Sequence, residues 1–446
     1  MVTRSIVSSE ERVELLIERL TYGGDGIATW NGLKVFVRFA APEERVRARI
    51  IQKKRDYAVA EIEEIIQPSP LRTEPRCQFY GLCGGCQLQH IDYTGQLVIK
   101  KLLVNDALQH IGKIFVPVSN IRNPGPAWHY RIKTQYPVRH NGQVKIGFFQ
   151  KATHHLLDIP ICYLHPSSFN EIRRQLLDSI AVAREKPYDE IAHRGNIRHI
   201  VLRENYDHRI LVVVVTRTNQ LDQRFISAIT ALPTVIGVVQ NINPDKTNRI
   251  LGPQTTKLSG TDHTFQIILN RKFRISSQSF FQVNPHQAQE LCRKLIDLIS
   301  PQGSETVLDL FCGVGMLSIV LAAMVKSVTA VEIESAAVND ARFNAEINQA
   351  GNVTFINDDV NRVIASLEQA DVVIIDPPRK GCNPETLKKV TALSPRILIY
   401  ISCNPATLAR DLAILEQSGY RCESVEPLDM FPQTTHVEII TKLVRY

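Results

Sequence analysis

The chain has 446 residues, more than one compact core usually organises, and this length predicts two to four domains. With 44% hydrophobic and 22% charged residues it can bury such cores, whereas 22 glycines, 23 prolines and nine cysteines are too few for collagen-like, disordered or disulfide-stapled classes. The formal net charge of +7 at pH 7 permits a polyanionic partner and does not require one.

The start of the chain favours a cytoplasmic location. Its first twenty residues include seven charged side chains, so they lack the uninterrupted apolar segment of a secretory signal. The longest uncharged stretch, residues 310–325, is shorter than the roughly 20 apolar residues that span a bilayer, and we expect no membrane association. In a reducing compartment an odd number of cysteines favours free, metal-bound or catalytic thiols over disulfides.

Residues up to Gln67 alternate short β-type runs with turns, such as the glycine-rich turn 23–26, and predict a small β-barrel. Basic side chains concentrate near residue 50, where strand alternation would place every second arginine on one face. Two interpretations of this hairpin remain open, a solvated surface and a surface that contacts phosphates. The basic residues are Arg45, Arg47, Arg49, Lys53, Lys54 and Arg55.

A cysteine-rich loop follows the barrel, and residues 94–112 then have the spacing of an amphipathic helix that ends at Gly112. The region from 116 to 275 is rich in β-type runs. Near its start lie aromatic and basic residues, namely Trp128, His129, Tyr130, Arg131 and Lys133. This mixture suits either stacking on bases with phosphate pairing or ordinary core packing, and both interpretations remain open.

From Ser304 onward, strands alternate with helices. Apolar runs typical of strands covered on both faces occur at 307–311, 328–333, 353–356, 372–375 and 397–401, and helical segments at 316–325 and 336–349. This order predicts an α/β fold, with a doubly wound, Rossmann-like parallel sheet. Two final runs, at 424–430 and 436–443, predict a terminal antiparallel pair.

The first of these strands leads into a glycine turn, residues 309–315, which allows backbone to approach a ligand closely. Ser318 stands where a dinucleotide-binding motif has its third glycine, so NAD is disfavoured. Glu332 ends the second strand, where a carboxylate can accept both hydroxyls of a ribose. The pattern indicates an adenosine cofactor without a pyrophosphate, S-adenosylmethionine; the alternative is a nucleotide or no ligand.

The fourth and fifth strands end in residues 376–381 and 402–407, so both ends lie over the crevice that the glycine turn occupies. Asn404 as N-cap and Pro405 in the first helical turn put Cys403 beside a helix N-terminus. The partial positive charge there favours a thiolate. Cys403 is therefore the candidate nucleophile.

Methylation of uracil C5 would explain a thiolate at this place. The carbon is too weakly nucleophilic to attack a sulfonium methyl, whereas thiolate addition to C6 generates negative charge at C5. A base must then remove the C5 proton before the thiolate can leave. Glu438 is the only acid of the last predicted strand and is the candidate base; a surface acid on an edge strand is the alternative.

Five segments resemble the RNA uracil-C5 methyltransferase family, namely 276–284, 309–315, 376–380, 402–410 and 436–438. The resemblance implies S-adenosylmethionine contacts from Gln282, Phe311, Glu332 and Asp376. It also implies Cys403 as nucleophile and Glu438 as the base. An acid near the adenine is either Asp358 or Asp359, of which we take Asp359. Met316 stands where several members carry a polar residue, so we expect no polar contact from it.

Cys77, Cys83 and Cys86 have the spacing C-x5-C-x2-C, which lacks a fourth thiol. By residue type alone, four thiolates serve zinc or an iron–sulfur cluster. The family resemblance implies a [4Fe-4S] cluster with Cys162 as the fourth ligand and a structural role.

Residues 23–28, 34–37 and 44–49 resemble the TRAM domain, an OB-like RNA-binding module. Together with the cysteine loop this resembles the 23S ribosomal RNA branch of the family, because the tRNA-specific relative lacks both additions. We therefore expect a monomer that methylates 23S ribosomal RNA. The alternatives are a tRNA uracil-C5 methyltransferase, a non-catalytic RNA-binding ribosome-assembly factor and an oxidoreductase.

The expected domains are a TRAM domain at 1–67, an iron–sulfur loop at 68–93, a helix joining the catalytic domain at 94–115, a central β-rich RNA-binding domain at 116–275 and the methyltransferase domain at 276–446.

Overall fold

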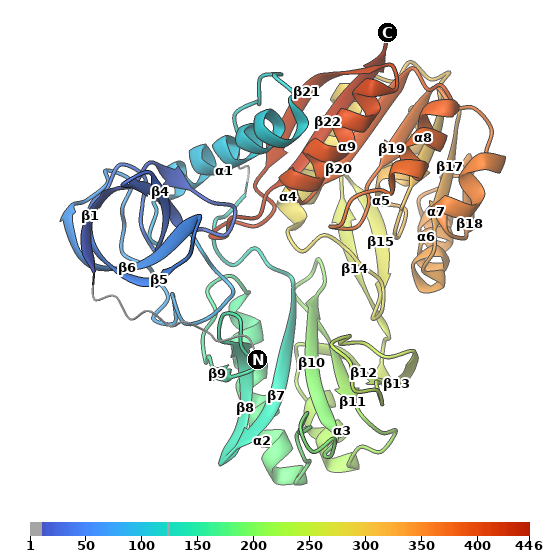
Figure 1. Ribbon diagram of the computed structural model, residues 1–446. Coiled ribbons are helices and arrows are strands. Elements are labelled where there is room, and N and C mark those ends of the chain that lie inside the picture. Colours follow the sequence, from blue (N-terminus) through green and yellow to red (C-terminus); the bar gives the residue numbers. More distant parts are fainter. Residues whose placement is uncertain (1–10, 123–124) are drawn as a thin grey trace, which may run out of the picture.

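The computed structural model describes residues 11–122 and 125–446, in which an N-terminal barrel and a central β-rich unit flank a Rossmann-like unit (Figure 1). The first ten residues of the expected TRAM domain, with Arg4 and Glu10, lie outside the described residues. None of the described helices is long and apolar enough to cross a bilayer.

The barrel is a six-stranded sheet of order β1-β5-β6-β4-β3-β2. Its strands are β1 (Arg12–Leu16), β2 (Arg19–Leu20), β3 (Gly26–Trp30), β4 (Leu33–Arg38), β5 (Arg45–Lys53) and β6 (Tyr57–Gln67). Alternation along β5 buries Val46, Ala48 and Ile50 in the barrel core, as predicted, and leaves its arginines on the outer face.

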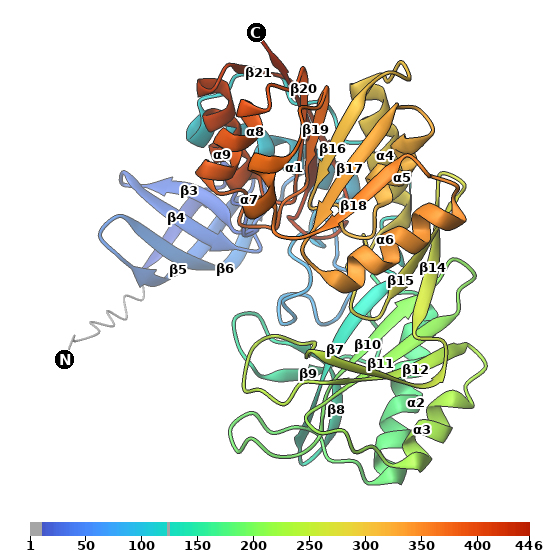
Figure 2. The same ribbon diagram turned by 90° about the vertical axis from the view of Figure 1, so that its right-hand side faces the viewer.

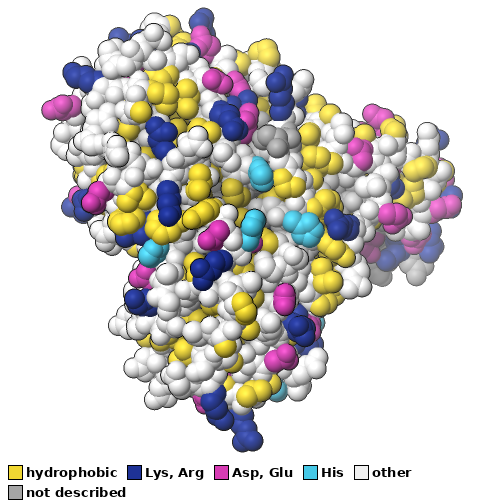
Figure 3. All heavy atoms as spheres, turned by 180° about the vertical axis from the view of Figure 1, so that it is seen from behind, with side chains coloured by type: hydrophobic (Ala, Val, Ile, Leu, Met, Phe, Trp, Pro, Cys, Tyr) yellow, Lys and Arg dark blue, Asp and Glu magenta, His cyan; other side chains and the backbone are white. Residues whose placement is uncertain are grey.

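The basic side chains of β5 are largely paired within the barrel. Arg47 forms ion pairs with Glu14 and Glu64, and Arg49 with Glu61 and Glu63. Acidic side chains accordingly lie among the basic ones on the barrel at the right of Figure 3. Exposed ion pairs of this kind contribute little free energy, so both interpretations of the hairpin, a solvated surface and a surface that contacts phosphates, stay open.

The central unit is a seven-stranded sheet of order β13-β12-β11-β10-β7-β8-β9, in which only β11 and β12 are parallel. Its elements are β7 (Lys133–Asn141), β8 (Gln143–Phe149), β9 (Leu156–Asp158), α2 (Ser167–Ala183), β10 (Ile197–Glu204), β11 (Ile210–Thr216), α3 (Gln223–Thr230), β12 (Val235–Ile242) and β13 (Gln254–Gly260). Residues of α2 and α3 share its hydrophobic core with the sheet.

The Rossmann-like unit contains a seven-stranded sheet of order β18-β17-β16-β19-β20-β22-β21, in which β22 is antiparallel to both neighbours. Its strands are β16 (Thr306–Leu310), β17 (Ser327–Glu332), β18 (Val353–Asn357), β19 (Val372–Ile375), β20 (Ile397–Ser402), β21 (Tyr420–Leu428) and β22 (Glu438–Arg445). The doubly wound prediction with its terminal antiparallel pair is therefore confirmed.

Alternation explains why helices cover both faces of this sheet (Figure 2). In β19, Val372 and Ile374 join one core, and Val373 and Ile375 join the other. The first core includes α4 (Pro285–Ile299), α5 (Met316–Ala322) and α6 (Ser335–Ile347). The second includes α7 (Val360–Val363), the 3₁₀ turn η2 (Ile364–Ser366), α8 (Pro384–Ala392) and α9 (Pro405–Gln417).

Two segments outside 276–446 pack with this sheet. Helix α1 (Tyr93–Ala107) and its π-helical end η1 (Leu108–Gly112) join the second core, which also takes Ile114, Val118 and Ile121. The hairpin of β14 (His263–Ile268) and β15 (Arg271–Ser276) joins the first core through Phe273. The hydrophobic cores of the Rossmann-like unit therefore include residues on both sides of positions 115 and 275.

Candidate active site

A cavity of about 670 Å³ lies where the cysteine loop, the central sheet and the carboxyl ends of the Rossmann-like strands meet. Cys403 and His436 line it, together with the basic residues Arg131, Lys133 and Arg379. Tyr130, from the same aromatic segment, is buried and donates a hydrogen bond of 3.0 Å to the Pro432 carbonyl. In the segment 128–133, some residues therefore pack in the core and others line the cavity.

The half-buried Cys403 follows β20 directly, and the predicted cap of the next helix is present. Asn404 is the N-cap of α9, Pro405 is its first residue, and the Asn404 side chain accepts a hydrogen bond of 3.1 Å from the Ala406 N–H. Burial and the neighbouring carboxylates of Glu438 and Asp376 nevertheless raise the pKa of the Cys403 thiol to about 11.

The surroundings of Cys403 thus act against the thiolate that the helix N-terminus was expected to favour. The Arg379 guanidinium lowers the pKa of the Cys403 thiol, but burial and the two carboxylates outweigh it. Near neutral pH the thiol keeps its proton.

Glu438 is the first residue of β22 and is only 3% exposed. Since β22 lies between β20 and β21, the interpretation of Glu438 as a surface acid on an edge strand is wrong. Its neighbour Ile439 pairs with Ser402, which precedes the nucleophile candidate. Burial and the nearby Asp376 raise the pKa of Glu438 well above its ordinary value. The candidate nucleophile and base thus come from adjacent strands.

The glycine turn positions Glu332 as the sequence pattern suggested. The Glu332 carboxylate accepts hydrogen bonds from the Gly313 N–H at 3.0 Å and the Glu334 N–H at 2.9 Å. Gly313 has φ 55° and Gly315 has φ 79°, a region that favours glycine, and Phe311 also has a positive φ of 66°. These hydrogen bonds fix the acid at the end of β17 beside backbone that is free to approach a ligand.

A second acid, Asp309, explains the serine at position 318. The buried Ser318 hydroxyl donates to one oxygen of Asp309, while the other oxygen has no hydrogen-bond partner among the residues that the structure describes. Burial raises the pKa of Asp309 to about 7 despite that hydrogen bond. Burial and the charges of Asp309 and Glu332 likewise raise the pKa of Asp376 to about 7.

Four acids therefore gather at the carboxyl ends of the strands, and we call them the acid cluster. They are Asp309, Glu332, Asp376 and Glu438. Their mutual repulsion favours a cation between them. S-adenosylmethionine carries a sulfonium and an ammonium group, and its ribose hydroxyls suit a carboxylate such as Glu332, so the acids present fit this cofactor.

For the other residues predicted to bind the cofactor, the described contacts do not decide whether they have this role. Gln282 is buried between β15 and α4. Asp358 donates its backbone N–H to the Glu332 carbonyl at 3.1 Å, whereas the Asp359 side chain caps α7 by accepting from the Asn361 N–H at 2.8 Å. The choice between Asp358 and Asp359 stays a prediction.

All four predicted metal-binding cysteines, Cys77, Cys83, Cys86 and Cys162, line the same cavity as Cys403, and none forms a disulfide. Burial, with a contribution from the other thiols, raises the pKa of Cys162 to about 11 and that of Cys86 further. Among the described residues, however, no three His, Cys, Asp or Glu side chains form a group suited to a single metal ion. The structure thus brings the thiols together without arranging a mononuclear site.

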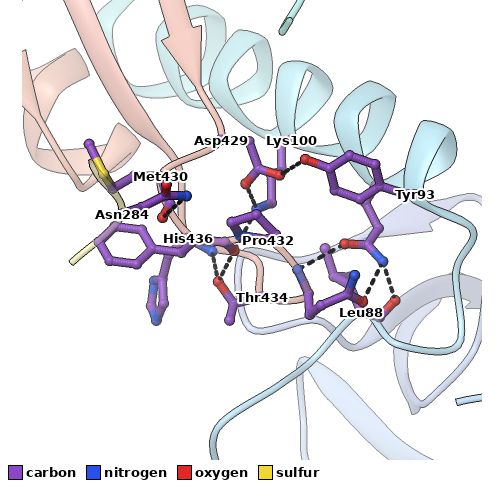
Figure 4. Close-up of polar contacts among 12 residues, drawn as sticks. Leu88, Tyr93, Lys100, Asn284, Asp429, Met430, Pro432, Thr434 and His436 are labelled. Atoms are coloured by element: carbon purple, nitrogen blue, oxygen red, sulfur yellow. Dashed lines mark hydrogen bonds and ion pairs between the residues drawn. The ribbon is translucent and has the colours of Figure 1, made fainter. Parts of the chain in front are cut away.

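The segment between β21 and β22, residues 429–437, which we call the base loop, is held by buried contacts that the sequence did not reveal (Figure 4). Lys100 of α1 forms an ion pair with Asp429, both side chains being 0% exposed, and donates to the Phe431 carbonyl at 3.0 Å. Gln96 accepts from the Gln433 N–H at 3.0 Å and donates to its side-chain oxygen at 2.9 Å. Helix α1 therefore positions the approach to Glu438.

Comparison with known proteins identifies the family. Residues 93–368 and 365–445 match the model described as tRNA (Uracil-5-)-methyltransferase, and residues 10–62 match the TRAM domain. An RNA methyltransferase of Listeria innocua is 40% identical over 98% of this chain and 99% of its own. Another, from Halalkalibacterium halodurans, is 39% identical over 98% of each chain.

A solved structure is similar over nearly the whole chain. The tRNA (uracil-54, C5)-methyltransferase of Pyrococcus abyssi, in complex with S-adenosyl-L-homocysteine, has a TM-score of 0.79 and 26% identity, covering 97% of this chain and 100% of that chain. This chain belongs to the RNA uracil-C5 methyltransferase family. It is an S-adenosylmethionine-dependent RNA methyltransferase with an N-terminal TRAM domain, and the oxidoreductase interpretation is wrong.

Replacing Arg379 tests the electrostatics of the nucleophile. Because the guanidinium lowers the pKa of the Cys403 thiol, Arg379→Ala should raise it and reduce the thiolate fraction. A shift of half a pKa unit would slow alkylation by iodoacetamide at pH 9 about threefold. Mass spectrometry of the Cys403 peptide in RNA-free protein measures the rate, and Lys380→Ala is the matched control. Equal rates in the two variants would contradict the assignment.

Replacing Lys100 tests the buried ion pair. Lys100→Met leaves Asp429 buried without its cation, which should cost about 3–5 kcal/mol of unfolding free energy. We expect a clear fall in the melting temperature measured by calorimetry, whereas Lys101→Met, on the exposed side of α1, should melt like the wild type. Similar melting of the two variants would show that the pair contributes little.

Proposed function

We propose that this chain, in the cytoplasm, methylates C5 of a uridine in 23S ribosomal RNA through a covalent bond between Cys403 and uracil C6. One observation carries the proposal: Cys403 lines the cavity, and Glu438 lies on the adjacent strand, close enough for its carboxylate to raise the pKa of the thiol. A nucleophile beside a buried carboxyl group is the pair that C5 methylation needs.

The chemistry divides into an addition and an elimination. The Cys403 thiol must first lose its proton, and we assign Asp376, whose carboxylate raises the pKa of the thiol, as the acceptor, so that Glu438 is left free for the second step. The sulfur then adds to C6, the C5–C6 double bond opens, and C5 becomes nucleophilic. S-adenosylmethionine supplies an electrophilic methyl group on its sulfonium. Glu438 then removes the C5 proton, so that the double bond re-forms and the C6–S bond breaks.

RNA must reach a cavity inside the protein, so the target base has to leave its stack. The basic residues of the wall, Arg131, Lys133 and Arg379, are placed to meet phosphates on either side of the flipped nucleotide. We propose that the central unit and the TRAM barrel bind the surrounding RNA, and that the sheet of 276–446 with helix 94–115 performs the transfer.

A second candidate substrate is tRNA. The reasoning for 23S ribosomal RNA depends on the barrel and the cysteine loop, which were expected to be absent from tRNA-specific relatives. The match to the Pyrococcus abyssi tRNA enzyme covers 97% of this chain and therefore reaches into both segments. Domain composition alone thus does not separate the two substrates.

The substrate is tested directly by incubating the protein with tritiated S-adenosylmethionine and separated 23S, 16S and transfer RNA from cells that lack the enzyme. We expect label in 23S RNA, located at 5-methyluridine after nuclease digestion. Label confined to transfer RNA would replace the proposed substrate and keep the chemistry, and label at any other base would overturn both.

Replacing the base separates the two halves of the reaction. Glu438→Gln should allow addition and methyl transfer but prevent proton removal, leaving RNA attached to Cys403. The adduct should appear as a slowly migrating band on a denaturing gel. Cys403→Ala should bind cofactor and RNA and form no band. Normal turnover of Glu438→Gln without an adduct would show that the base lies elsewhere, with Asp376 the next residue to test.

We propose further that Cys77, Cys83, Cys86 and Cys162 bind a [4Fe-4S] cluster. The four cysteines line one cavity, and burial raises the pKa of Cys83, Cys86 and Cys162, whose thiolates a cationic centre would stabilise. Cluster ligands bind different irons and so stand farther apart than the ligands of one zinc ion. The cluster would close the loop covalently against the central sheet.

Iron analysis tests the cluster. Protein isolated without oxygen should be brown and contain about four iron and four sulfide ions per chain. Cys83→Ser should lose most of the iron, whereas Cys312→Ser, in the cofactor turn, should retain it. Stoichiometric zinc without iron in the wild type would contradict the proposal.

A further inference from the structure

The N-terminal barrel reaches the catalytic residues through one side chain. Tyr22 follows β2, and its hydroxyl donates a hydrogen bond of 3.0 Å to the carbonyl oxygen of Cys403. The same hydroxyl lies 3.2 Å from Nδ1 of His436, and the two rings meet edge to face with centroids 5.8 Å apart. A residue of the barrel thus contacts both the nucleophile's backbone and the end of the base loop.

The glycine turn beside Tyr22 explains how the barrel comes so close. Gly24 has φ 88°, and a Cβ at this position would stand 2.8 Å from Cβ of Gln87 and 3.5 Å from the Thr435 methyl group. Any larger residue would therefore push the turn away from the cysteine loop and from the base loop. The turn that marks the TRAM domain in the sequence thus packs against catalytic segments.

The hydrogen-bond donors and acceptors around Tyr22 show what its hydroxyl group contributes. Arg379 can only donate, and its Nη2 lies 3.4 Å from Nδ1 of His436, so Nδ1 is the acceptor and the ring is neutral. Burial, with the nearby cations, accordingly lowers the pKa of His436 to about 4. The Cys403 carbonyl and His436 Nδ1 are therefore acceptors, and the Tyr22 hydroxyl, which also has a hydrogen bond with Arg379, is a donor within reach of both.

We infer that Tyr22 is a positioning residue for the methyl transfer, which holds the backbone of Cys403 and the ring of His436 in register and so orients the sulfur toward the target base. This inference rests on the proposed covalent mechanism. It gives the TRAM barrel a second role beside RNA binding, because a barrel side chain fixes the backbone of the nucleophile. A displaced nucleophile costs rate even when substrate binding is unchanged.

The test compares Tyr22→Phe with Tyr57→Phe, a barrel tyrosine whose ring packs on Phe36 away from the site. Both 23S and transfer RNA transcribed with 5-fluorouridine are used, since fluorine at C5 traps the adduct. For the RNA that wild type captures, Tyr22→Phe should form adduct about tenfold more slowly at saturating RNA, with little change in KM. Tyr57→Phe should match the wild type. An unchanged rate in Tyr22→Phe would overturn the inference.

A second readout needs no RNA. Loss of the hydroxyl should speed hydrogen–deuterium exchange in the peptide around Cys403 by a measurable factor in Tyr22→Phe but not in Tyr57→Phe. If wild type forms no adduct with either RNA while this difference in exchange persists, the proposed function fails and the positioning contact stands. Equal exchange in both variants would overturn the contact itself.

Discussion

Burial of carboxyl groups dominates the catalytic end of this protein: burial, with repulsion from neighbouring carboxylates, raises the pKa of Asp309, Asp376 and Glu438. A parallel sheet brings the carboxyl ends of its strands to one edge, and here several strands end in or near a carboxylate. Asp376 and Glu438 in turn raise the pKa of the Cys403 thiol. We expect a cation bound among these acids to lower these pKa values.

The antiparallel strand β22 is what adds the fourth acid. By entering between β20 and β21 it places Glu438 in the sheet interior rather than at an edge. The base loop that leads into it is fixed from outside the catalytic sheet, by Lys100 and Gln96 of α1 and by the cysteine loop, whose Leu88 N–H donates to the Gln433 carbonyl at 3.0 Å. The barrel, the cysteine loop and helix α1 thus all help to position the carboxyl group of Glu438.

Local sequence patterns predicted local structure well. Continuous apolar runs such as 372–375 identified strands, and Asn404 with Pro405 identified the start of α9, because caps and strands depend on neighbouring residues. Effects set by distant residues could not be predicted. The raised pKa of Cys403 reflects its burial and carboxylates from other segments, and the buried ion pair of Lys100 is formed with Asp429, more than three hundred positions later.

The central claim is that the acid cluster is partly protonated near pH 7 and releases protons when a cation binds among its acids. Calorimetry of cofactor binding tests this claim most directly. Titrations near pH 7 in buffers of different ionisation enthalpy give the number of protons released. The account predicts that S-adenosylmethionine releases more protons than S-adenosylhomocysteine, whose sulfur is neutral, and that Glu438→Gln reduces the difference. Equal proton release with both ligands, or none with either, would contradict it.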